Sequence, residues 1–143
     1  MKPLISRRCL ALLLSLLLCL PAAAGAGPTP QAYLARQFLL ALLRGEYAAA
    51  YALLAPETQA AMSRQQFRQA AAPLYEQGRQ AGAAIELYRL GLRLGENDDT
   101  RWFYAFTFRS DSAATAPTQL DVTFRDSVTA RVLEFRLVPG KGR

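Results

Sequence analysis

The side chains that most often carry out acid–base and metal chemistry in proteins are scarce in this sequence. It contains no histidine, so the usual proton shuttle at neutral pH and the commonest metal ligand are both missing. Its cysteines, Cys9 and Cys19, lie close to the start of the chain. No serine has the histidine that would activate it as a nucleophile. The sequence therefore predicts no catalytic residue, no metal site and no cofactor.

The carboxylates occupy positions with ordinary structural explanations. Asp121 and Glu134 alternate with apolar residues, so we expect them to face water. Glu86 lies near the start of a predicted strand, where the side it faces is ambiguous because Ile85 and Leu87 are also apolar. It is the one carboxylate expected near the rim of a pocket, and a charge at a strand end is a simpler interpretation than a general base. The remaining acids of this half fall in predicted turns and loops: Glu96, Asp98, Asp99, Asp111 and Asp126.

Aromatic residues on the apolar side of the predicted strands are the first candidates for binding. A tyrosine hydroxyl pointing into a cavity could bind a ligand's carbonyl, whereas a packed aromatic with its hydroxyl at the edge of the core is the alternative. The candidate ligand-binding residues are Tyr88, Trp102, Tyr104 and Phe106, and Phe108 is expected in the core beside them.

Arginines on the opposite side of the strands are the second candidates, and they share that side with Thr107, Thr123, Asp121 and Glu134. Cross-strand ion pairs on a solvated face are one interpretation. A basic platform for an anionic partner is the other. The arginines concerned are Arg89, Arg93, Arg109, Arg125 and Arg136.

Three helices are predicted ahead of these strands. Thr29 and Pro30 suit an N-cap and first turn, and the helix they begin should end near Arg44, before Gly45. A second, shorter helix is expected from about residue 46 to 54, ending where Ala55-Pro56 interrupts the pattern. Ser63 and Gln66 form a capping-box pattern that opens a third helix, in which Pro73 predicts a bend or early stop. Gly78 and Gly82 should close the helical half.

From about residue 84 the apolar period changes from 3.6 to 2, which predicts four strands. Their apolar positions are Tyr88, Leu90, Leu92 and Leu94; Trp102, Tyr104, Phe106 and Phe108; Leu120, Val122 and Phe124; and Leu133, Phe135 and Leu137. Strands joined by short turns pair antiparallel. Helices followed by strands indicate an α+β fold in which the helices cover the apolar face of the sheet.

The first twenty-four residues have the order of a secretory signal. Lys2, Arg7 and Arg8 precede an apolar run from Cys9 to Leu20, and Pro21 and small alanines follow. The run is shorter than the roughly 20 residues of a membrane span. Leu18 stands where a lipid-modified cysteine at position 19 would need a small residue, so a lipoprotein is not expected. We therefore predict a signal peptide over 1–24, a flexible spacer over 25–30 and one domain over 31–139, exported to the periplasm.

The net charge and the order of helices and strands give further indications of the class of protein. The chain has 17 basic and 11 acidic residues, and loss of the three basic residues of the signal leaves 14 against 11. That small excess does not indicate nucleic-acid binding. The segment from Phe38 to Tyr47, followed by Ala50-Tyr51-Ala52-Leu53-Leu54-Ala55-Pro56, resembles the nuclear transport factor 2-like superfamily, a cone-shaped, cystatin-like α+β fold. The resemblance covers residues 31 to 138 and implies three helices on a curved four-stranded sheet, but no particular substrate.

Three functions fit these expectations. The first is an exported binding domain without catalytic activity, whose partner is a small apolar ligand or an envelope protein. The second is a small-molecule isomerase or cyclase that uses the cone cavity, and a deep cavity with a carboxylate inside would favour it. The third is a structural interaction module, favoured if Trp102, Phe106 and Phe108 fill the cone.

We predict signal cleavage after Ala24, with Ala26 as the next choice, because small residues follow the apolar run there. Mass spectrometry of the exported protein should show an N-terminus at Gly25. A lipid-modified N-terminus at Cys19 would contradict the prediction.

Overall fold

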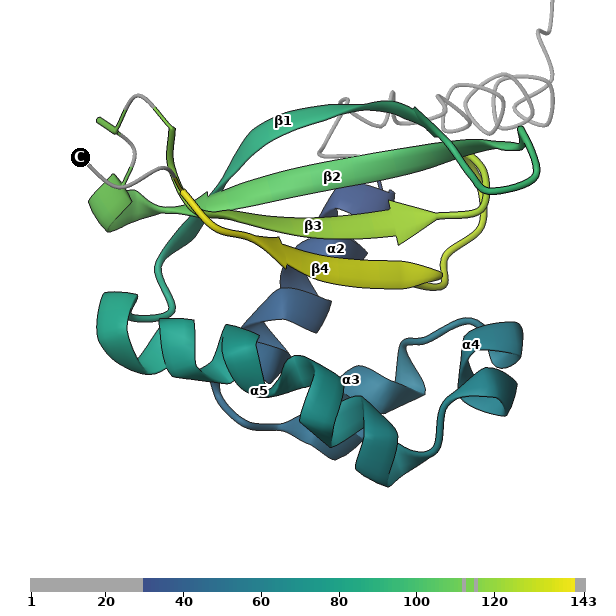
Figure 1. Ribbon diagram of the computed structural model, residues 1–143, viewed down its shortest axis with the longest axis horizontal. Coiled ribbons are helices and arrows are strands. Elements are labelled where there is room, and N and C mark those ends of the chain that lie inside the picture. The colour runs from purple at the N-terminus through teal and green to yellow at the C-terminus, as the bar shows by residue number, and fades with distance from the viewer. Residues whose placement is uncertain (1–29, 112, 115, 141–143) are drawn as a thin grey trace, which may run out of the picture.

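A computed structural model describes residues 30–111, 113–114 and 116–140. The predicted signal, most of the spacer and the Thr29 N-cap lie outside these residues. Within them, helices precede strands along the chain, as Figure 1 shows. The helices are α2 (Pro30–Leu43), α3 (Tyr47–Ala52), α4 (Pro56–Ala61) and α5 (Arg64–Ala81).

The strands form one antiparallel sheet in which each pairs with its neighbour along the chain. Their bounds are β1 (Ile85–Leu94), β2 (Thr100–Phe108), β3 (Gln119–Phe124) and β4 (Glu134–Val138), in the order β1-β2-β3-β4. Leu90, Tyr104, Val122 and Phe135 stand opposite one another across the strands, so their side chains share one face. The predicted α+β class and the four antiparallel strands are confirmed.

The helical half differs from the sequence prediction in two places. Pro56 begins a helix, α4, that was not predicted, because proline is favoured in the first turn, where its missing N–H is not needed. Pro73 does not end the third helix early, since α5 continues to Ala81. Burial of Leu74 and Gly78 on the far side of the proline offsets its local cost of about 3 kcal/mol.

The residues at and near the two ends of α5 explain the length of this helix. Ser63 and Gln66 form the predicted capping box, with hydrogen bonds of 3.2 and 2.8 Å between the side chain of each and the backbone N–H of the other. Gly78 does not end the helix; it lies against Leu43 of α2, and a Cβ there would stand 3.0 Å from that residue's carbonyl oxygen. Gly82 is the C-cap. The close crossing of α2 and α5 therefore requires a glycine at position 78.

Three phenylalanines join the helices to β4. The ring of Phe135 lies 5.4 Å from the rings of both Phe38 in α2 and Phe67 in α5, and the latter two are 6.3 Å apart. The hydroxyl of Tyr51, whose ring meets Phe67 edge-on, donates to the carbonyl oxygens of Gln59 and Met62 and so fixes α4 to this cluster. Figure 1 shows the result: α4 and α5 lie nearest to β4, and β1 is the strand farthest from them.

The inner face of the sheet, defined as the face that α2 covers, carries the core. α2 packs against β2 and β3. Its buried Phe38, Leu39 and Leu42 belong to one cluster with Phe106 and Leu120 from those strands. Gln31 adds a polar tie at the start of α2, because its amide nitrogen donates to the carbonyl oxygens of Asp126 and Thr129, at 2.7 and 2.8 Å.

A β-bulge in β1 interrupts the alternation of side chains that the sequence predicted for this strand. Leu87 stands opposite Phe106, and Arg89 stands opposite the next residue of β2, Ala105, so Tyr88 is an extra residue between them. Ile85 and Leu87 therefore share the inner face with Leu90 and Leu92, although their positions in the sequence differ in parity. The expectation that Tyr88 shares the parity of the core is wrong, because the bulge resets the alternation at this residue.

We expect Leu42→Ala and Phe106→Ala each to destabilise the fold by about 2–5 kcal/mol, as truncation of large buried side chains does. Both residues lie where α2 meets the sheet. Denaturant melts followed by circular dichroism measure the change. Val128→Ala, at a side chain 83% exposed, is the control and should change stability by less than about 0.5 kcal/mol. Equal effects from core and control variants would contradict this core.

Candidate binding surface

Most of the exposed large apolar side chains of the described residues lie on one strand, β1. We call the four leucines of its inner face, Leu87, Leu90, Leu92 and Leu94, the leucine strip; they are 45, 54, 57 and 70% exposed. Trp102, opposite Leu92 on β2, is half-buried and continues the strip toward the core. The sequence predicted these positions as core, and the structure overturns that for Leu90, Leu92 and Leu94. Contiguous apolar patches of this kind mark interaction surfaces.

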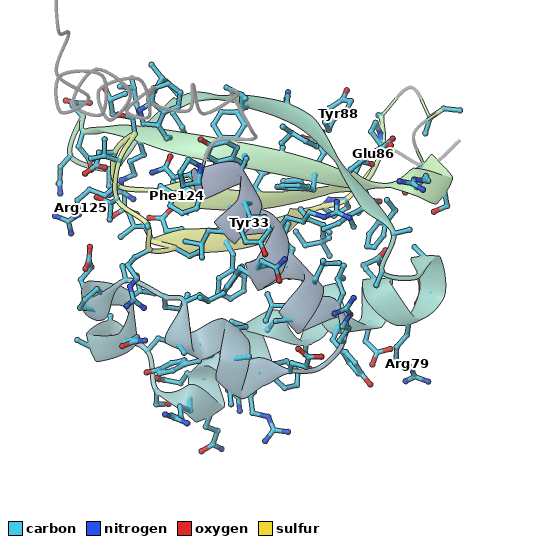
Figure 2. The ribbon with its side chains drawn as sticks, turned by 180° about the vertical axis from the view of Figure 1, so that it is seen from behind. Tyr33, Arg79, Glu86, Tyr88, Phe124 and Arg125 are labelled. Atoms are coloured by element: carbon cyan, nitrogen blue, oxygen red, sulfur yellow. The ribbon has the colours of Figure 1, made fainter. Side chains whose placement is uncertain are left out.

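The strip is uncovered because the helices pack toward the opposite edge of the sheet, near β4. The cluster of Phe38, Phe67 and Phe135 holds α5 and α2 toward β4. α2 crosses the inner face, where it packs against β2 and β3. Tyr33 of α2, labelled in Figure 2, is not part of the core. Its side chain is 58% exposed. Alternation in the sequence predicts which residues share a face, but not how much of that face a neighbouring layer covers.

The aromatic ligand-binding candidates do not come together around one cavity. Tyr104 and Phe106 are buried in the core, and the Tyr104 hydroxyl donates to the side-chain oxygen of Gln31 at 3.2 Å. Phe108 is fully buried beside them. Trp102 is half-buried, and Tyr88 is 47% exposed at the bulge, near Glu86 in Figure 2. The structure thus separates the exposed Tyr88 from the other three ligand-binding candidates, which lie on β2.

The outer face of the sheet, which points away from α2, is organised around a buried carboxylate. Asp121 is only 1% exposed, so the expectation that it faces water is wrong. Its Oδ2 accepts hydrogen bonds from Arg93 at 2.7 Å and Arg136 at 3.1 Å, while its Oδ1 has no hydrogen-bond partner among the described residues. Arg93 also lies over the ring of Phe103, 4.5 Å from its centroid. Long side chains from β1, β2 and β4 therefore close over the middle of β3.

Other charges on this face are also paired. Arg101, which the sequence analysis did not single out, pairs with Asp99 at 2.9 Å and with Glu134. Its position opposite Arg93 on the neighbouring strand could have marked it. Arg89 donates to Gln119 at 2.7 Å. These contacts agree with the interpretation of cross-strand ion pairs, except that Thr107, Asp121 and Thr123 are buried instead of solvated.

Arg109 and Arg125 do not lie near each other, although the strands that they follow are paired. β2 and β3 run antiparallel, with Trp102 opposite Phe124 and Thr107 opposite Gln119, so the two arginines follow opposite ends of the paired region. Arg125 pairs with Glu57 of α4 at one end of the sheet, and Figure 2 shows Glu86 near the other end. Arg109 begins the short 3-10 helix after β2. The five predicted arginines therefore do not form one platform.

Local hydrogen bonds lower three carboxylate pKa values. The pKa of Glu57 is lowered by its backbone hydrogen bond and by Arg125, and that of Asp99 chiefly by Arg101. The pKa of Asp126 is lowered by the hydroxyl and backbone N–H of Thr129 and the backbone N–H of Val128. These are structural carboxylates that stay ionised, which is the opposite of what a general acid requires.

Two grooves lie on the helical side of the molecule. One, of about 580 Å³, lies between the first turns of α3 and α5, where Arg64 and Arg68 stack over Tyr51 and Tyr47. Burial and the nearby Tyr75 raise the pKa of Tyr47. The other, of about 490 Å³, lies between α4, α5 and β4. It is lined chiefly by Met62, Leu74, Phe135 and Leu137, with Glu134 and Arg136 at its charged side. Neither groove is lined by Glu86 or by any of the four aromatic residues predicted to bind a ligand.

Further observations and comparisons add no named activity. Among the residues that the structure covers, no helix is both long and apolar enough to cross a membrane. Nor do three potential metal-ligating side chains of histidine, cysteine, aspartate or glutamate gather within that part of the chain. Comparisons with protein-family models, curated proteins and solved structures give no significant match.

We expect Asp121→Asn to lower the free energy of unfolding by about 1–3 kcal/mol, because it removes the charge that two arginines bind on a buried side chain. The partial exposure of both arginines keeps this loss below that of a fully buried ion pair. Glu134→Gln, at an exposed carboxylate on the same face, is the matched control and should cost about 0–1 kcal/mol. Urea denaturation measures both, and a smaller loss for Asp121→Asn than for Glu134→Gln would contradict this assignment.

Proposed function

We propose that this protein is an exported binding domain without catalytic activity, and that it binds a protein partner through the leucine strip. The exposure of Leu87, Leu90, Leu92 and Leu94 along one strand carries the proposal. A folded domain gains nothing in stability from four leucines in water, so a second surface that buries them is the physical explanation for their position. The adjoining half-buried Trp102 is of a residue type enriched at the centres of protein interfaces.

The filled interior of the domain supports binding over catalysis. Tyr104, Phe106 and Phe108 occupy the space beneath the sheet where a cone-shaped enzyme would need a cavity. The alternative, an isomerase or cyclase, would have to use the groove between α4, α5 and β4, where Glu134 is the carboxylate. That side chain is half-exposed and paired with Arg101. A small apolar ligand in the same groove is the second candidate for binding, because its walls are mostly aliphatic and aromatic.

We also propose that the fold is a small variant of the nuclear transport factor 2-like cone. The helix-first order and the single antiparallel sheet support this. The motif that carries the resemblance also has a structural role here, since Gly45 adopts a φ of +76° at the turn between α2 and α3. Tyr51 then ties α3 to α4 and α5. The arginine platform stays a weaker proposal, because most of its members have partners within the sheet.

Site-specific photo-cross-linking in the producing cell tests the proposed function. A photoreactive phenylalanine analogue at Leu92 should give a cross-linked protein adduct, because the side chain is in contact with the partner. The same analogue at Val128, which is 83% exposed in the loop between β3 and β4, is the matched control and should give none. The mass of the adduct on a denaturing gel identifies its class. No protein adduct at Leu92, or equal adducts at both positions, would overturn the proposal.

A further inference from the structure

β1 combines two features that a sheet edge rarely shows together. It is a ten-residue edge strand, so one row of its backbone N–H and C=O groups has no strand partner among the residues that the structure describes. Its inner face carries the leucine strip. The other edge, β4, has five residues and lies against α4 and α5. β1 is therefore the edge at which another strand can add to both the hydrogen-bond ladder and the apolar face.

The side chains of β1 are suited to pairing with a second copy of the same strand. In an antiparallel pair related by a twofold axis, residues directly opposite share a face, so the axis must pass through one residue. An axis at Leu92 places Leu92 opposite its own copy and Leu90 opposite Leu94. Three rows of leucine pairs then lie on the inner face. On the outer face, Gly91 stands opposite Arg93, and Arg89 lies opposite Gly95.

Neighbouring registers are disfavoured by charge or by the bulge. An axis at Gly91 would place Arg89 opposite Arg93, and an axis at Arg93 would place that arginine opposite its copy. Like charges directly opposite are destabilising. An axis at Leu90 would run the ladder into the bulge at Tyr88. Of these registers, only the axis at Leu92 gives three rows of leucine pairs and places arginine opposite glycine without reaching the bulge.

The outer face has room for this arrangement at Gly91. The ring of Phe103 covers this glycine, and a Cβ there would stand 3.1 Å from the ring. Arg93 of a second copy would thus meet no side chain at the opposite position, and it can keep its contacts with Asp121 and Phe103 of its own molecule. The absence of a side chain at position 91 accommodates both the ring of the same molecule and the arginine of its copy.

We infer that the protein forms a twofold symmetric dimer by antiparallel pairing of β1 with β1, centred on Leu92, which joins the two sheets into one. This inference rests on the proposed function and names its partner as a second copy of the chain. Pairing satisfies the backbone groups of both edges and buries both leucine strips.

Cysteine cross-linking tests the register. Across an antiparallel pair, opposite Cα atoms are about 4.5–5.5 Å apart, within the range of a disulfide. Mild oxidation of exported Leu92→Cys protein should therefore give a covalent dimer. Leu90→Cys is the matched control, because in this register two copies of residue 90 lie four residues apart along the strands and should not cross-link. The double variant Leu90→Cys/Leu94→Cys should cross-link again.

The chain without introduced cysteines must remain uncross-linked, which controls for Cys9 and Cys19. Analytical ultracentrifugation should give twice the monomer mass for the unmodified sequence and for Val128→Arg, and the monomer mass for Leu92→Arg, which places two cations on the axis. Thermal unfolding of Leu92→Arg confirms that it is folded.

The outcomes distinguish failure of the dimer from failure of the proposed function, which is binding of a protein partner through the leucine strip. Cross-linking through residue 92 but not through residue 90 alone supports the dimer. A monomer in solution, or cross-linking through residue 90 alone, overturns it. If the protein is monomeric and the photo-cross-linked adduct at Leu92 has a mass other than twice the chain, the dimer is wrong and the proposed function stands. No protein adduct together with a monomer overturns both.

Discussion

Contact among Phe38, Phe67 and Phe135 determines the layout of this domain. These rings bring α2, α5 and β4 into one cluster, with centroids 5.4 to 6.3 Å apart. A helical layer anchored to the last strand of this four-stranded sheet covers the first strand only at its start, where Ile85 is buried, and leaves the rest of that strand exposed. The leucine strip on β1 is thus a geometric result of where the aromatic contacts lie. A tightly packed core on one side and an open apolar edge on the other arise from the same interaction.

The charged side chains on the outer face of the sheet are mostly paired with one another, so they stabilise the fold. Asp121 gathers Arg93 and Arg136, Arg101 binds Asp99 and Glu134, and the neighbouring Arg89 is held by Gln119. Apart from the Arg101–Asp99 pair, each contact joins residues on different strands, so together they link the strands across the sheet. An anionic partner would have to compete with these internal acceptors. An apolar partner at β1 meets no such competition, which is why the leucine strip is the better candidate for function.

Much of the architecture follows from periodicity, and its failures have physical causes. Alternation predicts four strands and their antiparallel order, and Ser63 with Gln66 marks the start of α5. The bulge is invisible in the sequence because apolar residues precede and follow it in both parities. The burial of Asp121 and the exposure of Leu92 depend on which elements cover each face, and that is decided by contacts between distant segments. Local patterns carry no information on such coverage, so the predicted sites were less accurate than the predicted strands.

Tyr88 has a consequence for how this strand tolerates changes of length. Without it, residues 85 to 94 would alternate strictly between the two faces, with every leucine on one and both arginines on the other. Loss of any single residue between 89 and 94 would instead exchange the faces of all that follow. Position 88 is accordingly the place in β1 where a one-residue deletion preserves sidedness, and sequence variants that differ in length within this strand should differ there.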